Sequence, residues 1–273
     1  MSAIKPVVRN VAKSVFRAVA GNSPVAIGRM STRDQVLDAI APLKIVPVEQ
    51  ELVRIGGDYD GGYLVPDDFA GITACFSPGV DQIASFEEAI VNRLDVPCYL
   101  ADASVENPPV SNPRFDFEKK FVGTAKGELF MDFEDWVARK MGDDTTSDML
   151  LQMDIEGAEL DVLTHLSEAT FNRFRIIVLE LHALESLFAR NSVGFLASFF
   201  RKLTKNHVVV HNHPNNCCGI ETHMGISVPR VIEITLLRKD RATVKPGRVT
   251  IPNPLDMQNV RSKADITLPG EWY

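Results

Sequence analysis

Acids and histidines follow three successive apolar segments of the chain, at the points where those segments end. The residues are Asp154 and Glu156, then Glu180 and His182, then His211 and His213. In an open α/β sheet, ligands bind beyond the carboxyl ends of the strands, so these side chains lie where chemistry is expected. Because each buried charge or imidazole would need its own partner, six such groups at one edge favour a functional site.

Two kinds of chemistry fit these residues. A histidine that titrates near neutral pH, His182 or His211, is suited to deprotonating a hydroxyl group as a general base. Alternatively, Asp154, His182 and His211 together offer carboxylate and imidazole ligands to a divalent metal ion, Mg²⁺ or Mn²⁺. A structural interpretation also stands, in which Asp154 and Glu156 only favour the N-terminus of the following helix.

A strand, a tight turn and a helix are predicted around Asp154. The apolar run 149–153 predicts a buried strand, and Gly157 predicts the turn. Apolar residues then recur at helical spacing from Leu160 to Leu166, which predicts a helix that lies back on the sheet.

A glycine turn and an acid form a second pattern. Residues 71–77 predict a strand, followed by a turn at Gly79 and a helix from residue 85. The next predicted strand, 96–101, ends at Asp102, which lies 23 residues after Gly79. An acid at about this offset is placed to accept hydrogen bonds from ribose hydroxyls, with a plain loop aspartate as the alternative. The GxGxxG fingerprint is absent, which argues against NAD(P).

The segment 54–65 is rich in glycine, with four glycines and two acids between Arg54 and Gly62. Such a segment either brings its backbone close to a ligand or forms an ordinary hairpin turn. It lacks the GK[ST] sequence of a phosphate loop, so no nucleoside triphosphate site is predicted.

The remaining patterns complete an α/β arrangement. Further strands are predicted over 117–124, 175–182, 207–216 and 231–237, and further helices over 32–43 and 129–141. We therefore predict an α/β fold with a mostly parallel seven-stranded sheet, an antiparallel last strand and an N-terminal helical extension. The expected division is a helical extension at 1–45, a main domain at 46–240 and a C-terminal tail at 241–273 that packs on the domain.

Residues 4–20 predict an amphipathic helix with an apolar stripe of mainly valine. Lys5, Arg9, Lys13 and Arg17 form a basic stripe on another face. Three interpretations remain: the helix docks on the protein, it is a targeting peptide, or it makes weak contact with an anionic membrane surface.

Net charge and cysteine content limit the possible functions and the expected compartment of this protein. The chain has 273 residues and a formal net charge of −7, which argues against nucleic-acid binding, because phosphate affinity rests on Lys and Arg. Cys75, Cys98, Cys217 and Cys218 form no CxxC pair, and we expect four reduced thiols in a reducing compartment. No apolar run is long enough to span a membrane. A cytoplasmic protein is therefore expected, with peripheral membrane contact left open.

Several motifs resemble those of FkbM-type methyltransferases and related methyltransferase-like proteins. Residues 151–159, which read LQMDIEGAE, are similar to the K-x-D-I-E-G-x-E motif of that family. Other similar segments are DGGY at 60–63, the stretch 77–87, Asp102 after the second strand, and Glu180-Leu181-His182. The resemblance covers about residues 54–238. It departs at Gln152, where the family has lysine, and at Pro78, in a turn that lacks the family's D-x-G-A-N-x-G sequence.

The resemblance implies a Rossmann-like class I methyltransferase that uses S-adenosylmethionine and acts on an oxygen of a sugar or another small metabolite. It implies a cofactor site made of Arg54, Asp60, Gly62, Tyr63, Ser77, Pro78, Gly79, Asp81, Asp102 and Ala103. In that site Asp102 would hold the ribose and Arg54 the cofactor carboxylate, with Asp154 near the point of transfer. Two other functions stay open, a metal-dependent hydrolase and a non-catalytic binding module.

Overall fold

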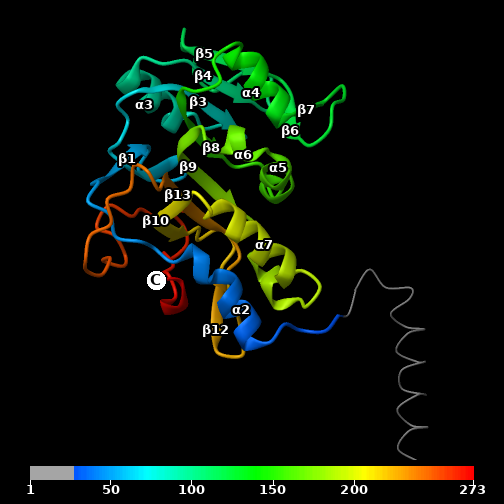
Figure 1. The fold of residues 1–273 in the computed structure, drawn as a ribbon, viewed down its shortest axis with the longest axis vertical. Helices are drawn as coiled ribbons and strands as arrows, with labels where there is room; N and C mark the ends of the chain where they lie inside the picture. The colour runs from blue at the N-terminus through cyan, green and yellow to red at the C-terminus, as the bar shows by residue number, and fades with distance from the viewer. Residues whose placement is uncertain (1–27) are drawn as a thin grey trace, which may run out of the picture.

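A seven-stranded sheet forms the centre of the computed structural model, which describes residues 28–273 (Figure 1). The helix predicted over 4–20 lies outside the described residues. The order across the sheet is β10-β13-β9-β8-β3-β4-β5. Its strands are β3 (Ile72–Pro78), β4 (Cys98–Ala101), β5 (Phe115–Glu118), β8 (Asp148–Met153), β9 (Phe174–Leu181), β10 (His207–Pro214) and β13 (Ile232–Arg238). The prediction of an α/β fold with a mostly parallel seven-stranded sheet is confirmed.

Strand β13 runs antiparallel to both of its neighbours, β9 and β10. It is the last strand of this sheet along the chain, but it lies one place in from the edge, between two strands that precede it. Strands that follow each other in sequence, β9 and β10, are therefore not neighbours in the sheet. This order decides which strand ends lie next to each other.

Helices cover both faces of the sheet, and its central strands are accordingly apolar on both sides. All eight residues of β9 are buried. Alternate side chains of β8 enter different hydrophobic clusters, with Leu151 in one and Leu150 in the other, as the two-residue period of a strand requires. Phe76 of β3 sits at the centre of the first cluster, where its ring meets those of Trp136 and Phe174 with centroids 5.2 and 5.9 Å apart.

Helices on the two faces bury their apolar stripes in these clusters. The helices are α2 (Arg33–Ile40), α3 (Ser85–Leu94), α4 (Phe133–Met141), α5 (Glu159–His165), α6 (Glu168–Phe171) and α7 (Val193–Leu203), with 3-10 turns η1 (Ala41–Leu43), η2 (Leu184–Phe188) and η3 (Gly270–Trp272). Residues of α2, α4, α5 and α7 lie in the first cluster and those of α3 in the second. Helix α2 begins at a capping box in which Thr32 and Gln35 bond each other's backbone.

In residues 28–273, three short strand pairs lie outside the main sheet. They are β1 (Leu52–Gly56) with β2 (Gly62–Pro66), β6 (Phe121–Gly123) with β7 (Phe130–Asp132), and β11 (Ile220–His223) with β12 (Ile226–Pro229). The glycine-rich segment is thus the loop of the β1–β2 hairpin. The single strand predicted over 117–124 is wrong, because the chain turns at Lys119 and Lys120 and residues 121–123 pair elsewhere.

The C-terminal residues after β13 run back along the molecule with little regular structure. The guanidinium of Arg261 lies 3.6 Å from the ring centre of Tyr59, in the loop of the β1–β2 hairpin. Near the last residue, Trp272 is fully buried and its indole nitrogen donates to the Ser227 carbonyl at 3.0 Å.

The cysteines depart from expectation at one place. Cys75 and Cys98 are free and buried, but Cys217 and Cys218 form a disulfide between adjacent residues. The expectation of four reduced thiols is therefore wrong for this pair. None of the helices within residues 28–273 combines the length and the apolar character needed to span a bilayer.

Candidate functional site

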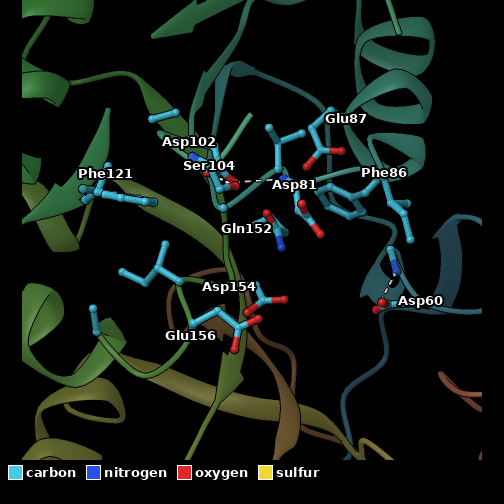
Figure 2. Close-up of a pocket in the computed structure, with 18 of the residues that line it drawn as sticks. Asp60, Asp81, Phe86, Glu87, Asp102, Ser104, Phe121, Gln152, Asp154 and Glu156 are labelled. Carbon is cyan, nitrogen blue, oxygen red and sulfur yellow. Dashed lines mark hydrogen bonds between the residues drawn. The ribbon is translucent and has the colours of Figure 1, made fainter. Parts of the chain in front are cut away.

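A cavity of about 470 Å³ opens at the carboxyl ends of β3, β4 and β8, where an α/β sheet places its ligands (Figure 2). Twenty residues line it: Asp60, Gly61, Tyr63, Gly79, Val80, Asp81, Ile83, Phe86, Glu87, Ala101, Asp102, Ser104, Phe121, Val122, Phe130, Gln152, Asp154, Ile155, Glu156 and Ala158. Six of these lining residues are acidic and none is basic. The cavity therefore favours a ligand that carries positive charge.

Asp102 is positioned by the end of β4 and holds the loop that follows it. Its Oδ1 accepts hydrogen bonds from the backbone nitrogen and the hydroxyl of Ser104 at 2.7 and 2.6 Å, and its Oδ2 accepts one from the Asp81 nitrogen at 2.9 Å. A carboxylate has about four acceptor positions. One position is therefore left on Asp102, on the wall of the cavity, for a donor such as a ribose hydroxyl.

The glycine turn after β3 packs directly against the end of β8. Gly79 has a φ of +92°, and a Cβ added there would lie 1.5 Å from the backbone oxygen of Asp154. The nitrogen of Asp154 in turn donates to the Pro78 carbonyl at 3.3 Å, and the nitrogen of Gly79 donates to Ala101 at 2.9 Å. Glycine is required here by the contact between two strand ends, which fixes Asp154 relative to the turn.

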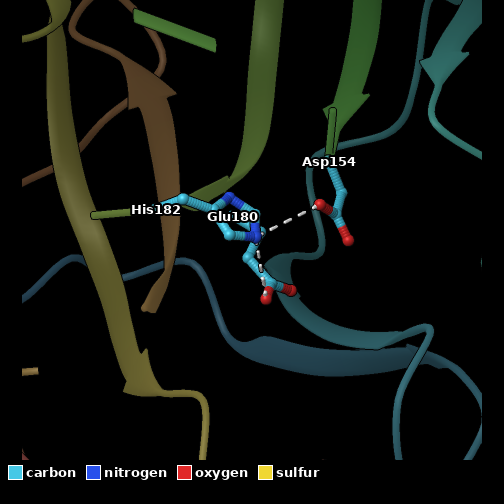
Figure 3. Close-up of side chains that lie close together, drawn as sticks. All are labelled: Asp154, Glu180 and His182. Atoms are coloured by element: carbon cyan, nitrogen blue, oxygen red, sulfur yellow. Dashed lines mark ion pairs between the residues drawn. The ribbon is translucent and has the colours of Figure 1, made fainter. Parts of the chain in front are cut away.

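Asp154, Glu180 and His182 gather beside the cavity at the ends of β8 and β9 (Figure 3). The Nε2 atom of His182 lies 3.8 Å from Asp154 Oδ1 and 3.8 Å from Glu180 Oε1. Each of the three residues offers a ligand atom within 4.8 Å of the other two.

Burial and like charges shift the protonation of this cluster. Burial raises the pKa of Asp154 to about 7, and the neighbouring carboxylates of Glu159 and Glu156 add to the shift against the opposing effect of His182. Burial and the charge of Asp154 raise the pKa of Glu180 well above its usual range. Burial lowers the pKa of His182, but the carboxylates of Glu159 and Asp154 outweigh it and the net shift is upward. Asp154 can thus exchange a proton near neutral pH.

Residues 81–206 match the family model described as the methyltransferase FkbM domain. This part of the chain is therefore similar to the FkbM methyltransferase domain. A search of curated proteins found no match.

The FkbM domain match includes Asp102, Asp154, Glu180 and His182, and it ends one residue before β10. The acid at the cavity wall and the whole three-residue cluster therefore belong to the matched part of the chain. The match supports a methyltransferase. His211 lies outside it.

Six of the residues predicted for the site line the cavity. They are Asp60, Tyr63, Gly79, Asp81, Asp102 and Asp154. The predicted residues that do not line it are Arg54, Gly62, Ser77, Pro78, Ala103, His182 and His211. His182 lies 3.8 Å from Asp154, at the neighbouring strand end. The other six lie behind the residues that line the cavity or in other parts of the structure.

The loop of the β1–β2 hairpin is held from two sides. Arg54 donates from Nε to the Gly57 carbonyl at 2.8 Å and from Nη2 to the Tyr59 carbonyl at 3.0 Å. The hydroxyl of Ser85, at the start of α3, accepts from the Gly57 nitrogen at 3.1 Å and donates to the Gly61 carbonyl at 2.8 Å. Arg54 is thus committed to the loop and does not line the cavity in which it was expected to pair with a ligand carboxylate.

Ser77, Glu87 and Gln152 form a buried polar floor under the cavity. The Ser77 hydroxyl lies in hydrogen-bonding contact with Glu87, and it is 2.6 Å from Gln152 Oε1. Burial raises the pKa of Glu87 to about 7. A protonated Glu87 can donate to Ser77 Oγ, which leaves the single Ser77 proton for Gln152. Gln152, at the position where the motif has lysine, keeps this floor uncharged.

The prediction that His211 joins Asp154 and His182 disagrees with the structure. Its Nε2 is 2.8 Å from Asp256 Oδ1, in the C-terminal tail. Burial would raise the pKa of Asp256, but its contacts with His211 and His213 hold that pKa well below the usual range. The physical reason is the insertion of β13, which separates β10 from β9.

Glu233 of β13 lies next to β9, the position at which His211 and His213 of β10 were expected. It is paired in register with Glu180 on one side and with His213 on the other. Its side chain accepts a hydrogen bond from Asn259 at 2.5 Å, and burial raises its pKa to about 7. The signal in the sequence is an acid inside the apolar strand 231–237, away from the strand ends at which the site was expected.

Proposed function

We propose that this protein is an S-adenosylmethionine-dependent methyltransferase that methylates a hydroxyl oxygen of a sugar or another small metabolite. The observation that carries the proposal is the acid-lined cavity at the carboxyl ends of β3, β4 and β8, with Asp102 on its wall and with much of its lining inside the FkbM match.

The cavity suits this cofactor in charge, shape and hydrogen bonding. S-adenosylmethionine carries a sulfonium and an ammonium group, whereas a dinucleotide would place an anionic pyrophosphate among six acids and no base. The free acceptor position of Asp102 suits a ribose hydroxyl. Phe121, Val122 and Phe130 offer apolar surface for the adenine base. The volume falls within the range of roughly 300–1,000 Å³ typical of small-molecule sites.

The cofactor, when bound, supplies an activated methyl group. The chain then needs to orient the acceptor oxygen, exclude water and take up its proton. Asp154 lines the cavity and has a pKa raised to about 7, so it is the group proposed to accept this proton. His182, 3.8 Å away, would share the charge that develops.

Calorimetric titration measures directly whether the protein binds S-adenosylmethionine. We expect wild-type protein to bind S-adenosylmethionine at micromolar concentrations and Asp102→Ala to weaken binding at least about 10-fold, because each hydrogen bond from a ribose hydroxyl to a carboxylate contributes roughly 1.5–3 kcal/mol. Asp161→Ala is the matched control, since it removes an exposed acid on α5 that does not line the cavity.

Two results would contradict the proposal. If folded wild-type protein shows no heat of binding, the protein does not use S-adenosylmethionine as its cofactor. If wild type and Asp102→Ala bind it equally well, the cofactor does not bind in the cavity next to Asp102. Incubation with isotope-labelled S-adenosylmethionine and a panel of sugars and hydroxylated metabolites then tests the acceptor class by transfer of the label.

A further inference from the structure

Three side chains from two adjacent strand ends share one small volume beside the cavity. Asp154 follows β8, Glu180 belongs to β9, and His182 follows β9. A divalent cation holds oxygen and nitrogen ligands at about 2.0–2.3 Å, so its ligand atoms lie roughly 3–4 Å apart. The distances of 3.8 Å from His182 Nε2 to Asp154 and to Glu180 already fall in that range.

Two buried carboxylate oxygens in this cluster lack a donor. Within residues 28–273, Glu180 Oε2 and Asp154 Oδ1 accept no hydrogen bond, although both atoms are shielded from solvent. The side chain of Glu180 is only 5% exposed, and a dashed line in Figure 3 marks its ion pair with His182. An unpaired buried carboxylate oxygen carries a large desolvation cost, which a bound cation would offset.

The orientation of His182 presents one ring nitrogen to the carboxylates. Its Nδ1 faces Glu159 Oε1 at 3.4 Å, without a well-directed hydrogen bond. Glu159 is itself fixed, because it accepts from the backbone nitrogens of Ile155 and Gly157 at 2.8 and 3.2 Å. Histidine ligands of metals characteristically turn their second nitrogen to a carboxylate or a carbonyl in this way.

We propose that Asp154, Glu180 and His182 bind a divalent metal ion, with Glu180 as the third ligand instead of the predicted His211. Carboxylates suit Mg²⁺ and Mn²⁺, while an imidazole ligand suits transition metals, so the mixed set favours Mn²⁺. Glu156 Oε2, exposed and 3.6 Å from His182 Nε2, is a further carboxylate within reach.

The ion lies at the edge of the cavity, because Asp154 lines it. Its remaining coordination positions would be open to an oxygen ligand of the acceptor, which would favour acceptors with two adjacent oxygens. This role rests on the proposed methyl transfer, whereas the metal site itself does not. With the ion bound, Asp154 would serve as a ligand, and the charge of the ion, in place of Asp154 as base, would lower the proton affinity of the acceptor oxygen.

Mn²⁺ binding to the full chain tests the site without any assay of activity. After chelator treatment, the free Mn²⁺ signal in electron paramagnetic resonance is followed while protein is added. We expect one ion per wild-type chain, and at least about 10-fold weaker binding for both Glu180→Gln and His182→Gln. Glu88→Gln, which removes an exposed carboxylate on α3, should bind as wild type does.

The proposal is overturned if folded wild-type protein leaves the Mn²⁺ signal unchanged up to millimolar concentration, or if both cluster variants bind as tightly as Glu88→Gln. Circular dichroism of each variant checks the fold, and His182→Gln, which is partly exposed, serves if Glu180→Gln fails to fold. Titration of S-adenosylmethionine on the same samples separates the two proposals. Cofactor binding without Mn²⁺ binding defeats the metal site alone, and the reverse result defeats the methyltransferase alone.

Discussion

Gly79 is the residue at which the two halves of the candidate site touch. Any side chain there would overlap the backbone oxygen of Asp154, and its φ of +92° is one that other residues rarely adopt. We expect Gly79→Ala to lower the free energy of unfolding by more than about 2 kcal/mol and to weaken cofactor binding, because the end of β8 must move away. Urea unfolding and calorimetry measure the two effects.

Gly194→Ala provides the matched control for this substitution. In the described part of the chain, nothing lies within 4 Å of the added Cβ at Gly194, in the first turn of α7. Alanine in a helix is favoured over glycine by up to about 1 kcal/mol, so this variant should be neutral or slightly more stable. If Gly79→Ala behaves like Gly194→Ala, the close contact between Gly79 and Asp154 does not exist in solution.

His207 should make stability depend on pH. Its side chain is fully buried and its Nε2 lies 2.7 Å from the Phe174 carbonyl. Its Nδ1 has no hydrogen-bond partner among residues 28–273. Burial lowers its pKa from 6.5 to about 4. Because the folded pKa is below the unfolded one, the stabilisation is complete above pH 6.5 and is lost as the pH falls towards 4, by about 3 kcal/mol.

Chemical unfolding at a series of pH values, compared with His207→Gln, measures this contribution. Glutamine keeps a donor for Phe174 but does not titrate, so the part of the slope due to residue 207 should vanish. A slope between pH 6.5 and 4 that is identical in the two proteins would show that His207 is accessible to protons in the folded state.

Sequence reasoning about single residues succeeded where the chemistry depends on local spacing. The offset from Gly79 to Asp102 placed both on one cavity, because the two parallel strands β3 and β4 are neighbours and their ends coincide. It failed where position depends on distant strands. Glu180 and Glu233 are paired across β9 and β13, which are far apart in the sequence, so no local pattern distinguishes their roles.

At the scale of elements, the strands were predictable and their order was not. Apolar runs and glycine turns located most strands of the main sheet, since both faces of that sheet are covered and periodicity survives. The position of β13 between β9 and β10 cannot be predicted from the hydrophobic pattern of the sequence. It is the reason that His211 meets Asp256 and not His182.

The 3-10 turn η3 provides a second test at this scale. Trp272 lies in this turn and is fully buried, and its indole nitrogen donates a hydrogen bond to the carbonyl of Ser227 in β12. We expect Trp272→Ala to lower the free energy of unfolding by about 3–5 kcal/mol, through lost apolar burial and the cavity left behind. Thermal unfolding measures the loss.

The neighbouring Tyr273→Ala is the control, because Tyr273 is 47% exposed. Its effect should remain within about 0.5 kcal/mol. Equal melting temperatures for the two variants would show that the turn η3 does not pack on the body of the protein in solution.

At the scale of the whole molecule, composition and periodicity sufficed for the fold class but not for the environment of the cavity. A net charge of −7 says nothing of where the acids lie. The structure gathers six of them around one cavity, through strand ends and a hairpin that are separated by up to 96 residues between Asp60 and Glu156. That concentration arises from topology, so it could be found only once the strands were assembled.

The hairpin loop held by Arg54 and Ser85 has a consequence for how ligands arrive. A loop of this glycine content would lose much conformational entropy if a ligand had to order it. Here four hydrogen bonds hold it already. An entering molecule meets a wall whose ordering cost was met during folding, so association should proceed in a single kinetic phase, without a slow step of loop closure.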